Sequence, residues 1–185
     1  MNELAVDEKR LVELMIGYQN GKMEDFNALY AALQSPLRRY LWTFVRDMST
    51  VDDLLQTTFL QLHRARHTYM PPRPVKPWMY AITRHVALMH LRSQRRRREI
   101  TPVENLPEIP IPPEVEKLGD RKIVRRLLLE LPRPAQEVLV LHHMLGLSFA
   151  EVGRIMGISS GAAKVRAHRA LKVLRTRIQE PGVPA

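Results

Sequence analysis

The chain has 185 residues, which is enough for one ordinary domain or two small ones, and its formal net charge at pH 7 is +10. It contains no cysteine, so disulfides, thiol catalysis and cysteine zinc sites are excluded. No apolar run approaches the roughly 20 residues that span a bilayer, and no secretory signal is visible at the N-terminus. We therefore expect a cytoplasmic location and no membrane insertion.

The first 98 residues predict a helical domain, because apolar residues recur at helical spacing and no strand period is visible. Pro36 is expected to kink or restart the second of its helices. A further helix is expected from about Val51, and the last begins near Lys76. The apolar positions that define these helices are, in chain order, Leu11, Leu14, Met15 and Tyr18; Phe26, Leu29, Tyr30 and Leu33; Val51, Leu55, Phe59 and Leu62; and Trp78, Ile82, His85 and Met89.

Positive charge is concentrated at the end of this domain. Between Phe59 and Arg98 there are ten lysines and arginines and no acidic residue. The other 19 basic residues balance the 19 acidic ones, so this block accounts for the whole excess charge. Such a block indicates a polyanionic partner, although a solvated basic face has the same composition.

Residues 99–114 predict an extended, flexible linker. The segment contains five prolines and four glutamates, and proline at this density continues neither a helix nor a central strand. Two roles stay open for it. Its glutamates resemble phosphates electrostatically, which suits a segment lying in a positively charged channel, but a solubilising spacer has the same composition.

Residues 145–175 predict a helix-turn-helix. Ser148 is a good N-cap residue, and Glu151 three positions later allows the reciprocal hydrogen bonds of a capping box. Gly157 can adopt the left-handed conformation that closes a helix, and Ser159 or Ser160 can cap the next, longer and basic helix. A glycine-bearing turn between two such helices is the geometry that places a helix in the major groove of DNA.

The sequence therefore predicts an all-α fold: two small helical domains, at residues 1–98 and 115–180, joined by a Pro/Glu-rich flexible linker at 99–114. In the second domain helices are expected near 115–130, 134–145, 148–156 and 160–178. The Gly153-x-x-x-Gly157 spacing is attributed to close packing between helices.

Three blocks of sequence resemble the extracytoplasmic-function (ECF) class of bacterial RNA polymerase sigma factors. The first is VDDLLQTTF, from Val51 to Phe59, and the second is KPWMYAITRHVA, from Lys76 to Ala87. The third runs from Leu131-Pro132 through Gly146-Leu147-Ser148 to Arg169-Ala170-Leu171. Each block is modestly specific, whereas all of them in this order are strongly so.

The resemblance implies a subunit that binds RNA polymerase core and directs initiation at particular promoters, without enzymatic activity or a cofactor. Members of this class are commonly held inactive by an anti-sigma factor, which is therefore an expected partner. In the first block, Asp53 and Gln56 match the residues that bind the clamp region of the polymerase β′ subunit. Asp52 lies with them, opposite the apolar face, and the expected polymerase-binding residues are Asp52, Asp53 and Gln56.

The second block matches the helix that opens and reads the promoter −10 element. Aromatic side chains beside cations suit this task, because a base leaving the stack needs a flat partner and phosphates need positive charge. Trp78 shares helical spacing with Ile82 and is expected in the core, whereas Tyr80 lies off that stripe and is expected to be exposed. The expected −10 residues are Lys76, Tyr80, Arg84, His85, Arg92, Arg95 and Arg96.

The basic helix near 160–178 matches the module that reads the −35 element. Its packing side is expected to consist of Ala163, Ala167, Ala170, Leu171 and Leu174. On the other side we expect Lys164, Val165 and His168 near base edges, and Arg166, Arg169 and Lys172 on phosphates. Ser160, with Ser159, is expected to donate hydrogen bonds to a phosphate at the start of the helix.

Other functions stay open on sequence grounds. A free-standing helix-turn-helix regulator would carry the same basic helix, and a basic RNA- or membrane-surface binder would bind without polymerase in a salt-sensitive way. No Walker loop, dinucleotide-binding glycine motif or zinc-protease motif is present. His63 and His67 lie four residues apart, but no third metal ligand is evident.

Overall fold

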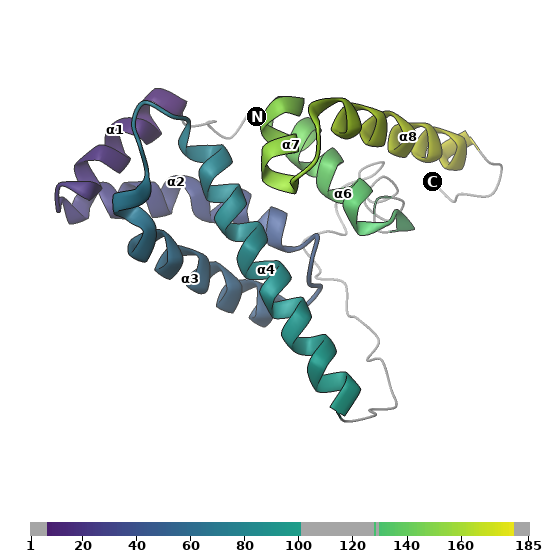
Figure 1. Ribbon diagram of the computed structural model, residues 1–185, viewed down its shortest axis with the longest axis horizontal. Helices are drawn as coiled ribbons and strands as arrows, with labels where there is room; N and C mark the ends of the chain where they lie inside the picture. Colours follow the sequence, from purple (N-terminus) through teal and green to yellow (C-terminus); the bar gives the residue numbers. More distant parts are fainter. Residues whose placement is uncertain (1–6, 101–127, 129, 180–185) are drawn as a thin grey trace. The chain divides into compact units, whose positions relative to one another are not determined.

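The computed structural model describes residues 7–100, 128 and 130–179. The regular elements within these residues are all helical (Figure 1), and the chain divides into two compact units, Met1–Thr101 and Pro102–Ala185. The predicted all-α fold is confirmed. Most of the predicted linker and of the predicted helix at 115–130 lies outside the described residues. The linker was predicted to begin at residue 99, but residues 99 and 100 still belong to the last helix of the first unit.

The first unit packs four α-helices around one apolar core: α1 (Glu8–Gln19), α2 (Met23–Leu41), α3 (Met48–Ala65) and α4 (Val75–Ile100). A short 3-10 turn, η1 (Arg66–Thr68), follows α3. Helix α4 contacts each of the other three helices, and α2 lies against both α1 and α3. Fully buried leucines from three helices, Leu11, Leu37 and Leu62, form part of the core. Their removal from water is the main force that holds the helices together.

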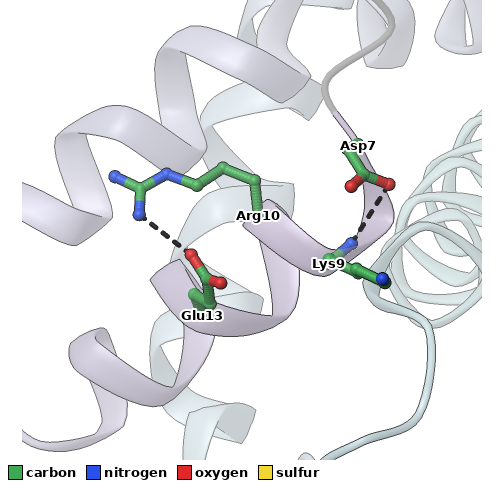
Figure 2. A network of polar contacts seen from close by, with 4 residues as sticks. All are labelled: Asp7, Lys9, Arg10 and Glu13. Carbon is green, nitrogen blue, oxygen red and sulfur yellow. Dashed lines mark hydrogen bonds and ion pairs between the residues drawn. The ribbon is translucent and has the colours of Figure 1, made fainter.

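Local signals explain where α1 and α3 begin. Asp7 accepts a hydrogen bond from the backbone N–H of Lys9 (3.4 Å) at the start of α1, and Arg10 pairs with Glu13 (3.1 Å) on the exposed side of the same helix (Figure 2). Asp47 caps α3 by accepting from the N–H of Thr50 (2.8 Å). Side-chain acceptors at these positions satisfy N–H groups that have no partner within the helix.

Of the two effects expected of Pro36, a kink or a restart, the restart does not occur, because α2 is one helix from Met23 to Leu41. Proline removes one helical hydrogen bond and costs roughly 3 kcal/mol or more inside a helix. Leu33, Leu37 and Leu41 are buried on both sides of Pro36, and their burial offsets this cost, since each buried leucine contributes about 1.5–3 kcal/mol.

The second unit contains α6 (Arg133–Leu139), a π-helical turn η3 (Val140–Met144), α7 (Phe149–Met156) and α8 (Ser160–Gln179). These bounds agree closely with the helices predicted at 134–145, 148–156 and 160–178. Helix α8 packs against both α6 and α7. The predicted capping box between Ser148 and Glu151 is confirmed, as is the left-handed Gly157 (φ 70°, ψ 36°) that ends α7.

Candidate nucleic-acid and protein interfaces

Helix α8 presents one apolar face and one cationic face, and the predicted division between them is confirmed. Ala163, Ala167, Ala170 and Leu174 are buried, and Leu171 is half-buried. The opposite face, here called the α8 face, consists of exposed Lys164, Val165, His168, Arg169 and Lys172. Arg166 is half-buried at its edge and Ser160 is exposed at its start. Since α8 contains no acidic residue, this face is suited to contact a polyanion.

The start of α8 is capped by Ser159. Its hydroxyl oxygen accepts a hydrogen bond from the N–H of Ala162 (3.1 Å), so of the two serines considered it is Ser159 that caps. Ser160 is the first residue of the helix itself. Its place at the positive end of the helix dipole is compatible with the predicted contact to a phosphate.

The turn between α7 and α8 is held by a close backbone approach at Gly153. A Cβ atom at this position would lie 2.7 Å from the carbonyl oxygen of Ile158 and 3.3 Å from the backbone nitrogen of Ser160. Only glycine leaves room for this approach. The close packing predicted for the Gly153-x-x-x-Gly157 spacing is therefore confirmed at Gly153, whereas a Cβ at Gly157 would meet no atom within 4 Å, and Gly157 serves as the left-handed end of α7.

The predicted inner face of α4 is wrong, because the buried side of the helix is rotated from the predicted side by about one residue position. The buried residues are Val75, Met79, Tyr80, Thr83, Val86 and Ala87. Of the residues predicted to face inward, Trp78 and Ile82 are half-buried, while His85 and Met89 are exposed. The helix has apolar residues on more than one side, so its periodicity alone does not select the face that packs against α1, α2 and α3.

The expected exposure of Tyr80 is likewise wrong. Tyr80 is only 2% exposed, and its ring packs edge-on against that of Tyr40 on α2, with 5.4 Å between the ring centroids. Burial raises the pKa of Tyr80 well above its ordinary value. The half-buried aromatic residue of α4 is Trp78, whose ring lies 5.3 Å from that of Tyr69. Of the two aromatic side chains of α4, Trp78 and not Tyr80 is therefore the one that is partly accessible.

The other predicted −10 residues on α4 are accessible. His85, Arg92, Arg95 and Arg96 are exposed, and Lys76 and Arg84 are half-buried. After Ala87 none of the α4 side chains described, up to Arg96, is buried, and the helix continues past the body of the first unit (Figure 1). We call Lys76, Trp78, Arg84, His85, Arg92, Arg95 and Arg96 the α4 face. It combines cations along a helix with one aromatic ring.

Helix α3 presents a third surface. Asp53 and Gln56 are exposed, as predicted from their position opposite the buried Val51, Leu55 and Phe59. Asp52 is only half-exposed, because its Oδ1 atom accepts a hydrogen bond from Nε of Arg38 (2.8 Å). One turn beyond Gln56, Leu60 is 47% exposed. We call Asp53, Gln56 and Leu60 the α3 face, a pair of polar groups beside an apolar anchor of the kind that protein interfaces use.

Of the two histidines considered for metal binding, His63 makes another contact. His63 Nδ1 is hydrogen-bonded to the hydroxyl of Tyr18 (2.6 Å). Over the described part of the chain, no group of three potential metal ligands is found. No helix among the described residues is long and apolar enough to cross a membrane.

Several contributing residues were missed from the sequence. Leu60 was not singled out, although its i+4 spacing from Gln56 is a signal. Arg38 is separated from Asp52 by a change of helix, and no local signal reveals the pair. Glu8 contacts the start of α4. The hint for such a partner is that Pro74, which precedes the helix, has no side chain that can cap it.

Comparison with known proteins matches both units to known families. The Sigma-70 region 2 family matches residues 29–97, and the Sigma-70, region 4 family matches residues 121–174. The RNA polymerase sigma factor CarQ of Myxococcus xanthus is 33% identical over 170 residues, which cover 88% of this chain and 94% of CarQ. The ECF RNA polymerase sigma factor SigF of Caulobacter vibrioides is 34% identical, covering 93% of this chain and 96% of SigF.

Solved structures agree in fold. The sigma factor RpoE in its complex with the anti-sigma factor NepR, from Bartonella quintana, superposes with a TM-score of 0.75 at 20% identity, covering 85% of this chain and 99% of that one. CnrH, solved in complex with the cytosolic domain of CnrY, superposes with a TM-score of 0.67 at 23% identity, covering 93% and 97%.

Proposed function

This chain belongs to the ECF class of RNA polymerase sigma factors, and on that premise we propose that its α3, α4 and α8 faces divide the work of starting transcription. The chain directs RNA polymerase core to promoters and initiates transcription there. The match to region 2 as well as region 4 carries this conclusion, since a free-standing regulator needs only the helix-turn-helix. The free-standing alternative is therefore set aside.

The α8 face is proposed to read the −35 element. Lys164, Val165 and His168 reach base edges in the major groove, and Arg166, Arg169 and Lys172 hold the phosphates on either side. This assignment is supported by the exposure of Lys164, Val165 and His168 on the side of α8 opposite its largely buried apolar face. Base edges supply sequence preference, whereas phosphates supply affinity.

The α4 face is proposed to open the −10 element. Duplex melting needs positive charge along the backbone and a flat surface for a base that leaves the stack. The accessible cations of α4 provide the first. The ring of Trp78, held against Tyr69, provides the second in place of Tyr80, which belongs to the core.

The α3 face is proposed to bind the clamp region of the polymerase β′ subunit. Asp53 and Gln56 supply polar contacts, and the half-exposed Leu60 supplies apolar area. Neither DNA-binding unit then needs high affinity by itself, because polymerase holds both at the spacing of the two promoter elements, and tethered sites gain avidity. Catalysis belongs to the polymerase, and the required compartment is the cytoplasm, where transcription takes place.

An anti-sigma factor is proposed as the regulatory partner. RpoE was solved with the anti-sigma factor NepR, which supports the same kind of partner here. Such a protein would inhibit by covering the α3, α4 or α8 face.

Run-off transcription with purified core enzyme tests the proposal. The chain should co-elute with core polymerase in gel filtration and should direct initiation from its own promoters, with little DNA affinity by itself. Tight, specific promoter binding by the isolated chain without polymerase would overturn it.

A further inference from the structure

The residues next to the start of α4 in the sequence offer no side chain that can cap this helix. The first N–H groups of an α-helix have no partner inside the helix and need an acceptor from elsewhere. Pro74 precedes the helix and offers no side-chain acceptor, and the first turn of α4 contains no acidic residue. Val75, the first residue, is fully buried, so water is a poor substitute.

The missing acceptor comes from α1. The N–H groups of both Val75 and Lys76 donate to Oε1 of Glu8, the latter at 3.1 Å. Glu8 lies in the first turn of α1, which Figure 1 draws beside the start of α4. A carboxylate at this point also interacts favourably with the positive end of the α4 dipole.

The other end of α1 holds the connection that leads into α4. Nε2 of Gln19 donates to the carbonyl oxygens of Arg66 (2.6 Å) and Tyr69 (2.9 Å). The hydroxyl of Tyr69 in turn donates to the carbonyl oxygen of Arg73, and the Tyr69 ring packs against Trp78. Gln19, at the end of α1, thus holds the beginning of the connection between α3 and α4. Glu8, at the start of α1, holds the first turn of α4.

We propose that Glu8 and Gln19 are positioning residues for promoter opening: they fix the first turn of α4, and with it Lys76 and Trp78, against the rest of the first unit. Helix α1 lies before the residues matched to region 2. The inference rests on the proposed role of the α4 face. Glu8 and Gln19 themselves need not touch DNA.

Three substitutions and a matched control test this in reconstituted holoenzyme. Glu8→Ala removes the cap, whereas Glu8→Gln keeps an acceptor oxygen and loses only the charge. Glu13→Ala is the control, because Glu13 lies on the same helix, with a side chain 65% exposed, and pairs only locally with Arg10 (Figure 2). Gln19→Ala gives a second, independent variant should Glu8→Ala fold poorly. For each we would measure affinity for core enzyme, thermal unfolding, and open-complex formation at a fixed, saturating holoenzyme concentration.

Glu8→Ala is expected to lower open-complex formation about fivefold or more, the factor that loss of a helix cap represents, while affinity for core stays within about twofold of wild type. Glu8→Gln should recover much of the loss, and Glu13→Ala should match wild type. If α1 only stabilised the fold, core affinity and opening would fall together with the folded fraction. That parallel loss, or normal opening by both Glu8→Ala and Gln19→Ala, would overturn the proposal.

The same assay separates this inference from the proposed function. Should Lys76→Ala and Arg84→Ala impair opening while Glu8→Ala and Gln19→Ala do not, the role of α1 is wrong and the α4 face stands. Should all of these variants open promoters normally, the α4 assignment fails as well.

Discussion

Arg38 on α2 and Asp52 on α3 are joined by a hydrogen-bonded ion pair with an Nε–Oδ1 distance of 2.8 Å, while the neighbouring Asp53 is exposed. The carboxylates of Asp52 and Asp53 are adjacent in the sequence but therefore have different roles. Asp52 ties two helices of the first unit together, whereas Asp53 faces solvent beside Gln56 and Leu60.

Asp53→Asn should weaken binding to core polymerase by about fivefold, an effect of about 1 kcal/mol, without changing the stability of the chain. Asp52→Asn should have the smaller effect on core binding and lower the free energy of unfolding by no more than about 1 kcal/mol, because both partners of its ion pair are substantially exposed. Fluorescence titration with core enzyme and urea unfolding measure the two effects. A larger loss of core binding in Asp52→Asn would contradict the assignment.

Tyr80→Ala should lower the stability of the chain, whereas Trp78→Ala should lower promoter opening. Tyr80 is buried against Tyr40, so its removal should cost about 3–5 kcal/mol of stability and reduce every function with the folded fraction. Trp78→Ala should leave core binding intact and lower opening of the −10 element about tenfold, as loss of one stacking partner does. Trp78→Phe is the control that keeps a ring. Permanganate reactivity of thymines in the −10 element reports the opening. Equal loss of core binding in both alanine variants would argue against a DNA role for Trp78.

Lys164→Ala and Arg169→Ala test the division between base and phosphate contacts on the α8 face. Arg169→Ala should weaken binding to all promoters similarly and lower the salt dependence by about one phosphate contact. Lys164→Ala should instead change the ranking among −35 sequences, by about 1–3 kcal/mol at the affected base pair. Holoenzyme binding to a panel of −35 variants at several salt concentrations measures both. A uniform loss in Lys164→Ala would remove its base-reading role.

Gly153→Ala should destabilise the second unit by about 1–3 kcal/mol, because the added Cβ meets backbone atoms that cannot move aside easily. Gly161→Ala is the matched control: the nearest atom to its Cβ is the Ser159 hydroxyl oxygen at 4.0 Å, and alanine is favoured over glycine inside a helix by roughly 0.5–1 kcal/mol. Thermal unfolding should therefore move in opposite directions for the two variants. A neutral Gly153→Ala would show that the turn is looser than its geometry indicates.

Asp47 makes stability depend on pH in the acid range. Hydrogen bonds from the side chain of Ser49 and from Thr50 lower the pKa of Asp47 from 3.8 to about 2. The folded state thus favours the charged form, so the stabilisation is complete above about pH 4 and is lost as the pH falls towards 2. Asp47→Asn should be less stable than wild type at pH 6, with the gap narrowing between pH 4 and pH 2. Urea unfolding at these pH values gives the comparison, and a gap independent of pH would contradict it.

The helix-turn-helix could be predicted almost completely from the sequence. Its signals are local: Ser148 and Glu151 cap each other within one turn, Gly157 ends the helix, and the alanines of α8 recur on one side. Interactions between residues three or four positions apart require only that the helix form, so the sequence contains all the information they need.

The orientation of α4 and the capping of its first turn were decided by the tertiary structure. Apolar residues lie on more than one side of α4, and contact with Tyr40 and the rest of the first unit selects the face that contains Tyr80 over the one that contains Trp78. Likewise Glu8 caps a helix that begins 67 residues later in the chain. Both outcomes depend on which helices meet in the folded unit, and helical periodicity, which is a property of neighbours along the chain, does not specify this.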